Sequence, residues 1–238
     1  MTATPSNPRG LQDIPFKLPQ VDPAKKRRAK HICELLKEHY PDAHCELNFT
    51  NPHELLIATI LSAQCTDVAV NKATPTLFEA FPTPADYAKA SPQDIEPLVK
   101  TLGFFRNKAK SVHAAMTTVS ESYDGNVPQT MDELLALRGV ARKTAGVVLS
   151  NAYNINIGFV VDTHVMRLSQ RFGLIDEAEE GNPVKIEKKL MALFPRGDWG
   201  QLSHLLIWHG RRICKARNGS CADHPICKRY GTCGTSKA

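Results

Sequence analysis

Apolar residues recur along most of this chain at intervals of three and four positions, with short polar breaks between the runs. That period places them on one face of an α-helix, whereas the strict alternation typical of half-buried strands is nearly missing. Several runs follow a pair in which the first residue is a good N-cap and proline fits the first helical position. The pairs are Asn51-Pro52, Ser91-Pro92 and Asn182-Pro183.

The first two of these pairs each mark the start of a predicted helical segment. The apolar run after Asn51 predicts a helix from His53 to about Val68, and the run after Ser91 lies in a segment that ends at Gly103. The one β-like run, residues 155–161, is too isolated to form a sheet. We therefore expect an all-α protein.

Further helices are predicted from other start and stop signals. Thr130 and Glu133 form a capping box for a short helix that stops at Gly139. The other predicted helices run from Asn182-Pro183 to just before Pro195, from Asp198 through His209, and from Thr163 to Arg171 with Asp162 as N-cap. Residues 1–23 carry five prolines and little periodic apolar content, which predicts a disordered or extended tail.

The charge and the cysteine content indicate which binding partners and which cellular compartment to expect. The formal net charge is +6, and residues 211–233 hold six cations against one acid, a basic patch of the kind that contacts phosphates. No apolar run is long enough to span a bilayer, and the N-terminus has no apolar leader segment. The seven cysteines, an odd number, indicate reduced thiols. We expect a cytoplasmic protein with no membrane partner.

Four cysteines crowd together near the C-terminus: Cys214, Cys221, Cys227 and Cys233. Thiolates this close are ready metal ligands, and four of them suit tetrahedral zinc or an iron–sulfur cluster. Zinc sites commonly pair short knuckles, whereas the gaps here are six, five and five residues. These wide gaps favour a larger 4Fe-4S core, with zinc and disulfides as the alternatives.

A glycine turn precedes a helix start at Gly139, and it is followed at once by Arg142 and Lys143. Backbone N–H groups at such a turn can hold a phosphate. An amine is nucleophilic only when neutral, so the site of Lys143 must lower a pKa that is ordinarily about 10.4. The neighbouring Arg142 and the helix N-terminus both act in that direction.

One isolated carboxylate, Asp162, follows about twenty residues later. It can accept a proton from the amine or stabilise positive charge on a sugar as a base departs. Taken singly, Lys143 reads as a phosphate-contacting lysine and Asp162 as a simple N-cap; their order and spacing together favour catalysis.

These motifs resemble those of the endonuclease III family of base-excision DNA glycosylases, over about residues 24–233. The resemblance implies an all-α fold of two lobes with DNA in the cleft between them. One lobe is a six-helix barrel with a helix-hairpin-helix, residues 46–156. The other is an iron–sulfur domain of residues 24–45 and 157–238, and residues 1–23 form the tail.

The resemblance also implies bifunctional chemistry on double-stranded DNA. Lys143 displaces a damaged base at the sugar C1′, forms a Schiff base and nicks the strand by β-elimination, with Asp162 as the activating acid. Oxidised pyrimidines and abasic sites are the expected substrates of a monomer, associated with the nucleoid if the source is bacterial. The alternatives are a monofunctional glycosylase that uses water, and a non-catalytic DNA-binding or redox module.

Two loops match family segments that open the duplex. Residues 61–67 resemble the Leu-Ser-x-Gln-x-Thr-Asp pattern, which implies that Gln64 enters the helix and bonds the orphaned base. The loop after Gly103 matches a wedge loop, which places Phe104 in the base stack. Without the motifs, these residues would read as an ordinary loop glutamine and a core phenylalanine.

The chain departs from the family pattern at two places. The second glycine of the Gly-Val-Gly turn is Ala141, whose methyl is expected to hinder close approach to phosphate or to strain the turn. We still expect the hairpin, Gly139 with Ala141 and Arg142, to bind DNA with altered affinity. The middle cysteine gap is three residues longer than the family's, and His224 stands where the third cysteine would fall. Four cysteine ligands are favoured over a set that includes His224.

Overall fold

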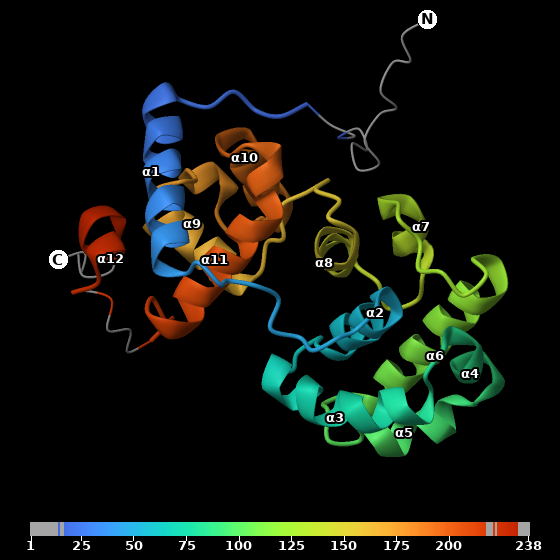
Figure 1. Ribbon diagram of the computed structural model, residues 1–238. Helices are drawn as coiled ribbons and strands as arrows, with labels where there is room; N and C mark the ends of the chain where they lie inside the picture. Colours follow the sequence, from blue (N-terminus) through green and yellow to red (C-terminus); the bar gives the residue numbers. More distant parts are fainter. Residues whose placement is uncertain (1–13, 15–16, 218–220, 222, 233–238) are drawn as a thin grey trace, which may run out of the picture. The chain divides into compact units, whose positions relative to one another are not determined.

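The computed structural model describes residues 14, 17–217, 221 and 223–232, which form helices and no strand (Figure 1). The α-helices are α1 (Pro23–His39), α2 (Pro52–Leu61), α3 (Asp67–Ala80), α4 (Pro84–Lys89), α5 (Pro92–Val99), α6 (Phe105–Ser122), α7 (Met131–Ala136), α8 (Arg142–Tyr153), α9 (Thr163–Arg171), α10 (Pro183–Leu193), α11 (Trp199–Arg212) and α12 (Pro225–Tyr230). Two short 3-10 turns, Glu177–Glu179 and Arg196–Asp198, flank α10. The all-α prediction is confirmed for this part of the chain.

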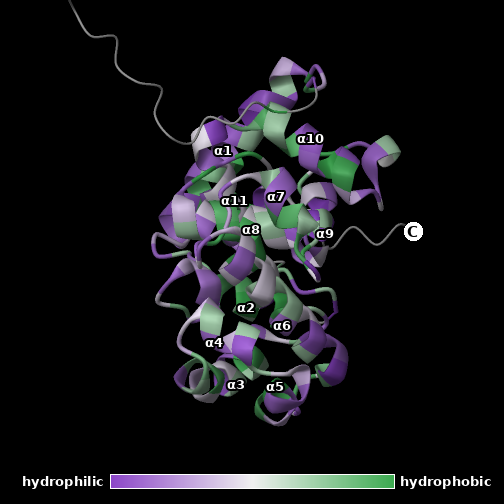
Figure 2. Ribbon diagram, turned by 90° about the vertical axis from the view of Figure 1, so that its right-hand side faces the viewer, coloured by the Kyte–Doolittle hydropathy of each residue, from purple (hydrophilic) through white to green (hydrophobic). Residues whose placement is uncertain are grey.

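The chain divides into two compact units, residues 45–155 and residues 1–44 with 156–238. In the first unit, α2 is buried from Leu55 to Leu61, and Figure 2 colours most of this helix as hydrophobic. α2 packs against α3, α6 and α8, and α6 packs in turn against α4 and α5. We call residues 45–155 the hairpin unit.

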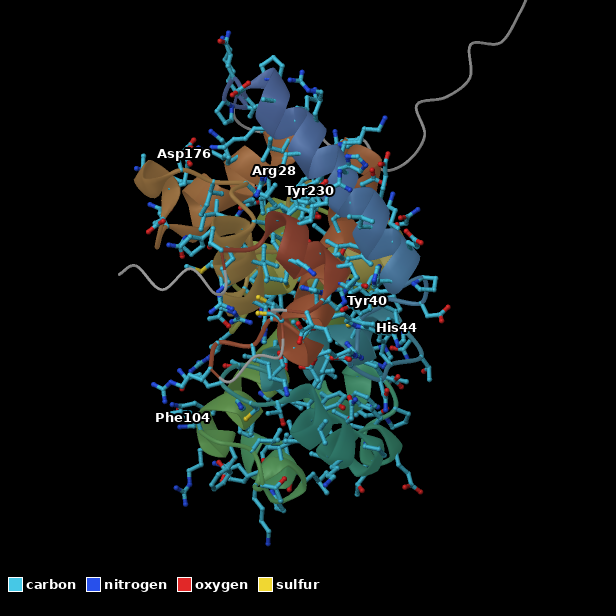
Figure 3. All side chains as sticks on the ribbon, turned by 90° about the vertical axis from the view of Figure 1, so that its left-hand side faces the viewer. Arg28, Tyr40, His44, Phe104, Asp176 and Tyr230 are labelled. Atoms are coloured by element: carbon cyan, nitrogen blue, oxygen red, sulfur yellow. The ribbon has the colours of Figure 1, made fainter. Side chains whose placement is uncertain are left out.

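The second unit, here called the cysteine unit, gathers α1 with α9 to α12. Its core is built from buried apolar side chains on all five helices, with Trp199 and Phe172 among the largest. Arg28 joins α1 to α12, because its guanidinium donates to the carbonyl oxygens of Phe172 (2.7 Å) and Tyr230 (2.8 Å). Figure 3 shows Arg28 and Tyr230 side by side at this contact.

The predicted helix starts are confirmed where the capping side chain bonds a backbone amide within three residues. Asn51 accepts from the Glu54 amide at 3.0 Å, and Asn182 accepts from the Lys185 amide at 3.1 Å. Asp162 caps α9, whose bounds, Thr163–Arg171, are those predicted. Caps act within three residues, so sequence alone suffices to find them.

Several predicted helix ends are wrong. The helix expected from His53 to about Val68 stops at Leu61, and α3 starts at Asp67 with Thr66 as its N-cap. The apolar repeat continues across the gap between α2 and α3, so the sequence does not show that one helix ends and another begins there. The segment after Ser91 is helical only to Val99, rather than toward Gly103.

The other differences concern caps and short ends. α7 ends at Ala136, before the hairpin turn, rather than at Gly139. α11 runs past His209 to Arg212. Asp198 stands at the N-cap position of α11, as predicted, but its side chain makes no cap bond, and its carboxylate accepts a hydrogen bond from the Lys37 ammonium at 2.7 Å. The predicted start of α11 is thus confirmed, whereas the side chain of its N-cap residue forms a long-range ion pair.

The predicted N-terminal tail falls mostly outside the described residues. α1 begins at Pro23, the last residue of that tail, with Asp22 as N-cap. Leu18 and Val21 pack against the core of the cysteine unit. Among the described residues, no helix combines the length and the apolar character that a membrane span requires.

Candidate active site and metal centre

The hairpin turn between α7 and α8 requires glycine at one position. Gly139 has φ +82°, a conformation that side chains rarely adopt. A Cβ added there would lie 2.8 Å from the Ser111 Cβ and 3.5 Å from an Ile60 methyl. Both the backbone angle and the packing therefore disfavour any larger residue.

Ala141 sits in a different backbone region. It is the N-cap position of α8 with φ −95° and ψ 168°, extended values open to any residue. The expected strain from its methyl is therefore wrong, whereas its effect on phosphate approach stays a prediction. Arg142 and Lys143 follow as the first two residues of α8, and Lys143 is exposed.

Gln64 and Phe104 share an unusual backbone. Their φ values are +55° and +58°, in the left-handed region where residues other than glycine are uncommon. Both side chains are exposed, and Phe104 retains 67% of its accessible surface. A core role for Phe104 is thereby excluded. Strained residues at exposed tips are typical of functional sites.

One face of α6 connects these loops to the hairpin. Phe104 directly precedes the helix, Lys108 lies one turn further, and Ser111 another turn on. Lys108 is buried and its Nζ donates to the Cys65 Sγ at 2.9 Å, next to Gln64. Ser111 packs against Gly139. The three motifs therefore meet along the first half of α6.

Asp162 begins α9 in the cysteine unit and is half-buried. Its Oδ1 accepts from the amides of His164 and Val165, both at 2.8 Å. Within the described part of the chain, no hydrogen bond involves Oδ2. One oxygen thus holds the helix start, and the other has no hydrogen bond among the described residues.

The far end of α9 reaches the predicted metal centre. Arg171 donates from Nη1 to the Cys214 Sγ at 3.1 Å and to the Lys215 carbonyl at 2.9 Å. Arg167 donates to the carbonyl oxygens of Gly210 (3.0 Å) and Cys214 (3.1 Å). These bonds fix the loop after α11 on which Cys214 lies.

Three of the four predicted metal ligands come together. Cys214, Cys221 and Cys227 are buried, and their sulfur atoms all lie within 4.8 Å of one another. Cys233 lies outside the described residues. Three converging buried thiols fit a thiolate-bound metal or cluster, because soft ligands of this kind select zinc and iron–sulfur groups.

Histidines surround one side of this centre. His209, His224 and Cys227 form a second group whose ligand atoms lie within 4.8 Å. Burial, with the nearby His224 and His39, lowers the pKa of His209 to about 3. Burial also lowers the pKa of His224 and raises that of Tyr40 to about 12. The Nδ1 atom of His224 is buried without a hydrogen-bond partner.

The predicted site residues divide between the units. Lys143 and the predicted DNA contacts belong to the hairpin unit, and Asp162 and the cysteines belong to the cysteine unit. A cavity of about 520 Å³ also opens in the cysteine unit, lined by α1 and by Leu193, Phe194 and Pro195. None of its lining residues is a predicted site residue.

Sequence reasoning missed the residues that hold these sites in place. Lys108 and Ser111 carry no motif of their own, and their role depends on contacts with segments about 30 to 40 residues away. His209 stands five residues before Cys214, a spacing that is the one available signal. In the sequence, Arg171 is recognisable only as the end of a predicted helix.

The fold and hairpin agree with a known class. The family described as "HhH-GPD superfamily base excision DNA repair protein" matches residues 57–196, which span the hairpin, Lys143 and Asp162. The fold and the site therefore define this chain as a base excision DNA repair protein.

Individual relatives are more specific. Endonuclease III of Synechocystis is 48% identical over 215 residues, covering 90% of this chain and 95% of the relative. Endonuclease III of Bacillus subtilis is 42% identical, covering 79% and 84%. A solved structure of a trapped endonuclease III–DNA covalent intermediate is 40% identical with a TM-score of 0.80, covering 85% and 94%. The chain belongs to the endonuclease III family.

Proposed function

We propose that this protein is a bifunctional DNA glycosylase and abasic-site lyase that removes oxidised pyrimidines. The observation that carries the proposal is Lys143, exposed in the first turn of α8 directly after a turn whose backbone angle and packing favour glycine. Backbone N–H groups at that turn and helix start suit a DNA phosphate. The lysine next to them would then reach the sugar of the same strand.

The proposed chemistry proceeds through the Lys143 amine. Nζ attacks C1′ as the bond to the damaged base breaks, and the base leaves with the bonding electron pair. Loss of a proton from nitrogen and opening of the sugar ring give a Schiff base. Removal of a C2′ proton then expels the 3′ phosphate and nicks the strand. Asp162, through its open Oδ2, stabilises the positive charge that develops on the sugar.

Gln64 and Phe104 are proposed to open the duplex. An everted nucleotide leaves a gap in the stack and an orphaned partner base. The Gln64 amide can donate and accept, so it can bond more than one base. Exposed Phe104 offers an aromatic ring to the neighbouring step. Both residues have a left-handed backbone and exposed side chains.

The cysteines are proposed to hold a 4Fe-4S cluster. Cys214, Cys221 and Cys227 supply three thiolates, and Cys233 supplies the fourth. Cys227 is preferred over His224 because its sulfur belongs to the buried three-thiol group. When bound, the cluster would supply a rigid scaffold for the basic segment that presents Lys215, and Lys228 on α12, to the DNA backbone. A monomer acting on double-stranded DNA, in the cytoplasm or nucleoid, is proposed.

A relative supports the covalent route. The solved structure at 40% identity is a trapped covalent intermediate of endonuclease III with DNA. A protein this similar, over 94% of its length, that forms a covalent complex favours the same step here.

Borohydride trapping tests the proposal. Sodium borohydride reduces a Schiff base to a stable amine, so wild-type protein incubated with a thymine-glycol duplex should yield a covalent protein–DNA adduct. Lys143→Ala should form none, and its strand nicking should fall at least about a hundredfold. Lys89→Ala removes another exposed lysine of the hairpin unit and should trap like the wild type.

Each other outcome identifies a different protein. Base release without an adduct would indicate a monofunctional glycosylase that uses water. Binding of abasic DNA without base release or nicking would indicate a non-catalytic module. An adduct that persists in Lys143→Ala would mean that another amine is the nucleophile.

A further inference from the structure

His209 lies between a tyrosine and a predicted metal ligand. It is completely buried on α11, with Phe172 against its ring at a centroid distance of 5.7 Å. Its Nδ1 is 2.9 Å from the Tyr40 hydroxyl, and its Nε2 is 3.1 Å from the Cys227 Sγ. Figure 3 labels Tyr40 at the end of α1, so the contact joins α1, α11 and α12.

The chemistry of a ligating cysteine decides which nitrogen carries the proton. Thiols lose their proton when they bind a metal, so the bound Cys227 Sγ can only accept a hydrogen bond. Nε2 must therefore donate. A neutral imidazole has one donor and one acceptor nitrogen, so Nδ1 accepts and the Tyr40 hydroxyl donates to it. The three groups form one directed chain, from Tyr40 through His209 to Cys227.

We propose that His209 is a positioning residue of the metal centre. It donates a hydrogen bond to the Cys227 thiolate, and this bond raises the reduction potential of the bound cluster. Tyr40 selects the tautomer that makes this bond possible. The inference rests on the proposed cluster and is independent of the chemistry at Lys143.

The direction of the effect follows from charge. Reduction adds an electron to the cluster and makes its sulfur atoms more negative. A hydrogen bond to sulfur therefore stabilises the reduced state more than the oxidised state, and hydrogen bonds of this kind are among the known determinants of cluster potential. Arg171 donates to a different sulfur, that of Cys214, so its contribution stays when His209 is replaced.

The test compares reduction potentials of full-length, iron-loaded proteins by a redox titration followed by electron paramagnetic resonance. His209→Leu removes the donor and should lower the potential. The ratio of reduced to oxidised cluster at a fixed potential should fall about tenfold, which is about 59 mV for a one-electron couple. His209→Gln retains an N–H donor and should recover part of the shift.

Two further variants separate hydrogen bonding from packing. Tyr40→Phe leaves the imidazole in place but frees its tautomer, so the potential should fall by a smaller amount. Phe172→Leu disturbs the packing around the same ring and keeps the donor, so the potential should match the wild type. If His209→Leu does not fold, the Tyr40→Phe and His209→Gln proteins still decide the matter.

Three results would overturn the inference. The first is an unchanged potential in the His209 and Tyr40 variants that hold iron. The second is an equal shift in Phe172→Leu, which would assign the effect to packing. The third is wild-type protein without iron, which would remove the proposed cluster as well. Borohydride trapping through Lys143 would still judge the repair chemistry separately.

Discussion

At the scale of single residues, Asp162 caps a helix with one oxygen, and the proposed mechanism uses the other. Oδ1 holds the first turn of α9 through two amide bonds of 2.8 Å. Oδ2 is left for the proposed stabilisation of a sugar cation. Because each task uses a different property of the side chain, hydrogen-bond acceptance or negative charge, substitutions can separate them.

Asp162→Asn is expected to keep the fold and lose the chemistry. Asparagine caps helices as well as aspartate does, so the melting temperature should stay within about 1–2 °C of the wild type. The charge that stabilises the transition state is lost, so single-turnover base release should slow by about a hundredfold or more.

Asp162→Ala is the matched comparison. Alanine cannot cap, so this variant should lose about 1 kcal/mol of stability in addition to activity. Calorimetry and single-turnover kinetics on both proteins give the two readings. An Asp162→Asn protein with wild-type base release would show that Asp162 serves only as a cap.

At the scale of elements, α6 organises the hairpin unit. Lys108 connects the helix to the Gln64 loop through its hydrogen bond to Cys65, and Ser111 packs against Gly139 of the hairpin turn. A buried ammonium needs a hydrogen-bond partner, because desolvation of an isolated charge is costly. The Lys108–Cys65 hydrogen bond therefore holds the Gln64 loop in a fixed position relative to the start of α6.

Gly139→Ala is expected to disrupt this arrangement. The left-handed φ costs an L-residue about 1–2 kcal/mol, and the new methyl would meet Ser111 at 2.8 Å. Denaturant unfolding should show a loss of at least about 1 kcal/mol, and affinity for abasic-site DNA should fall with it.

Gly103→Ala provides the control for stability. No atom lies within 4 Å of a Cβ built at Gly103, which is in the same unit. Its unfolding midpoint should remain close to that of the wild type. A Gly139→Ala protein as stable as Gly103→Ala would contradict the tight packing of the hairpin on α6.

At the scale of the whole molecule, both units carry a histidine that resists protonation. In the hairpin unit, burial lowers the pKa of His53, whose Nε2 is 3.1 Å from the Pro82 carbonyl oxygen. In the cysteine unit, burial is the largest cause that lowers the pKa of His164, and Arg167 adds to it. In the unfolded chain each would titrate near the ordinary value of about 6.5.

Stability should therefore decline as the pH falls below about 6.5. Between the unfolded pKa and the lower folded pKa, the unfolded chain binds more protons than the native protein, so protonation favours unfolding. The contribution is complete above about pH 6.5 and is lost progressively toward the folded pKa values. Melting temperatures between pH 7.5 and 5.5 should fall, and the fall should be smaller in His53→Gln. Parallel curves for the two proteins would rule out this source of the acid sensitivity.

Much of the architecture depends only on neighbours along the chain. The all-α class, the caps at Asn51 and Asn182 and the full extent of α9 could be predicted, because a cap or a helical face involves residues within about four positions. The hairpin glycine is also local, since its turn requires a positive φ. At Asp198 the predicted helix start is also confirmed, but the carboxylate bonds Lys37 on α1 rather than the backbone of α11.

The arrangement of the site needed the folded structure. The contacts from Lys108 to Cys65 and from His209 to Cys227 join residues far apart in the sequence, and no periodicity encodes which pairs meet. The left-handed backbone at Gln64 and Phe104 is intrinsically unfavourable, so it persists only because surrounding packing imposes it. The sequence by itself determined which residue types and helix starts are present. Tertiary packing decided which side chains meet, because that choice depends on burial and on contacts among distant segments.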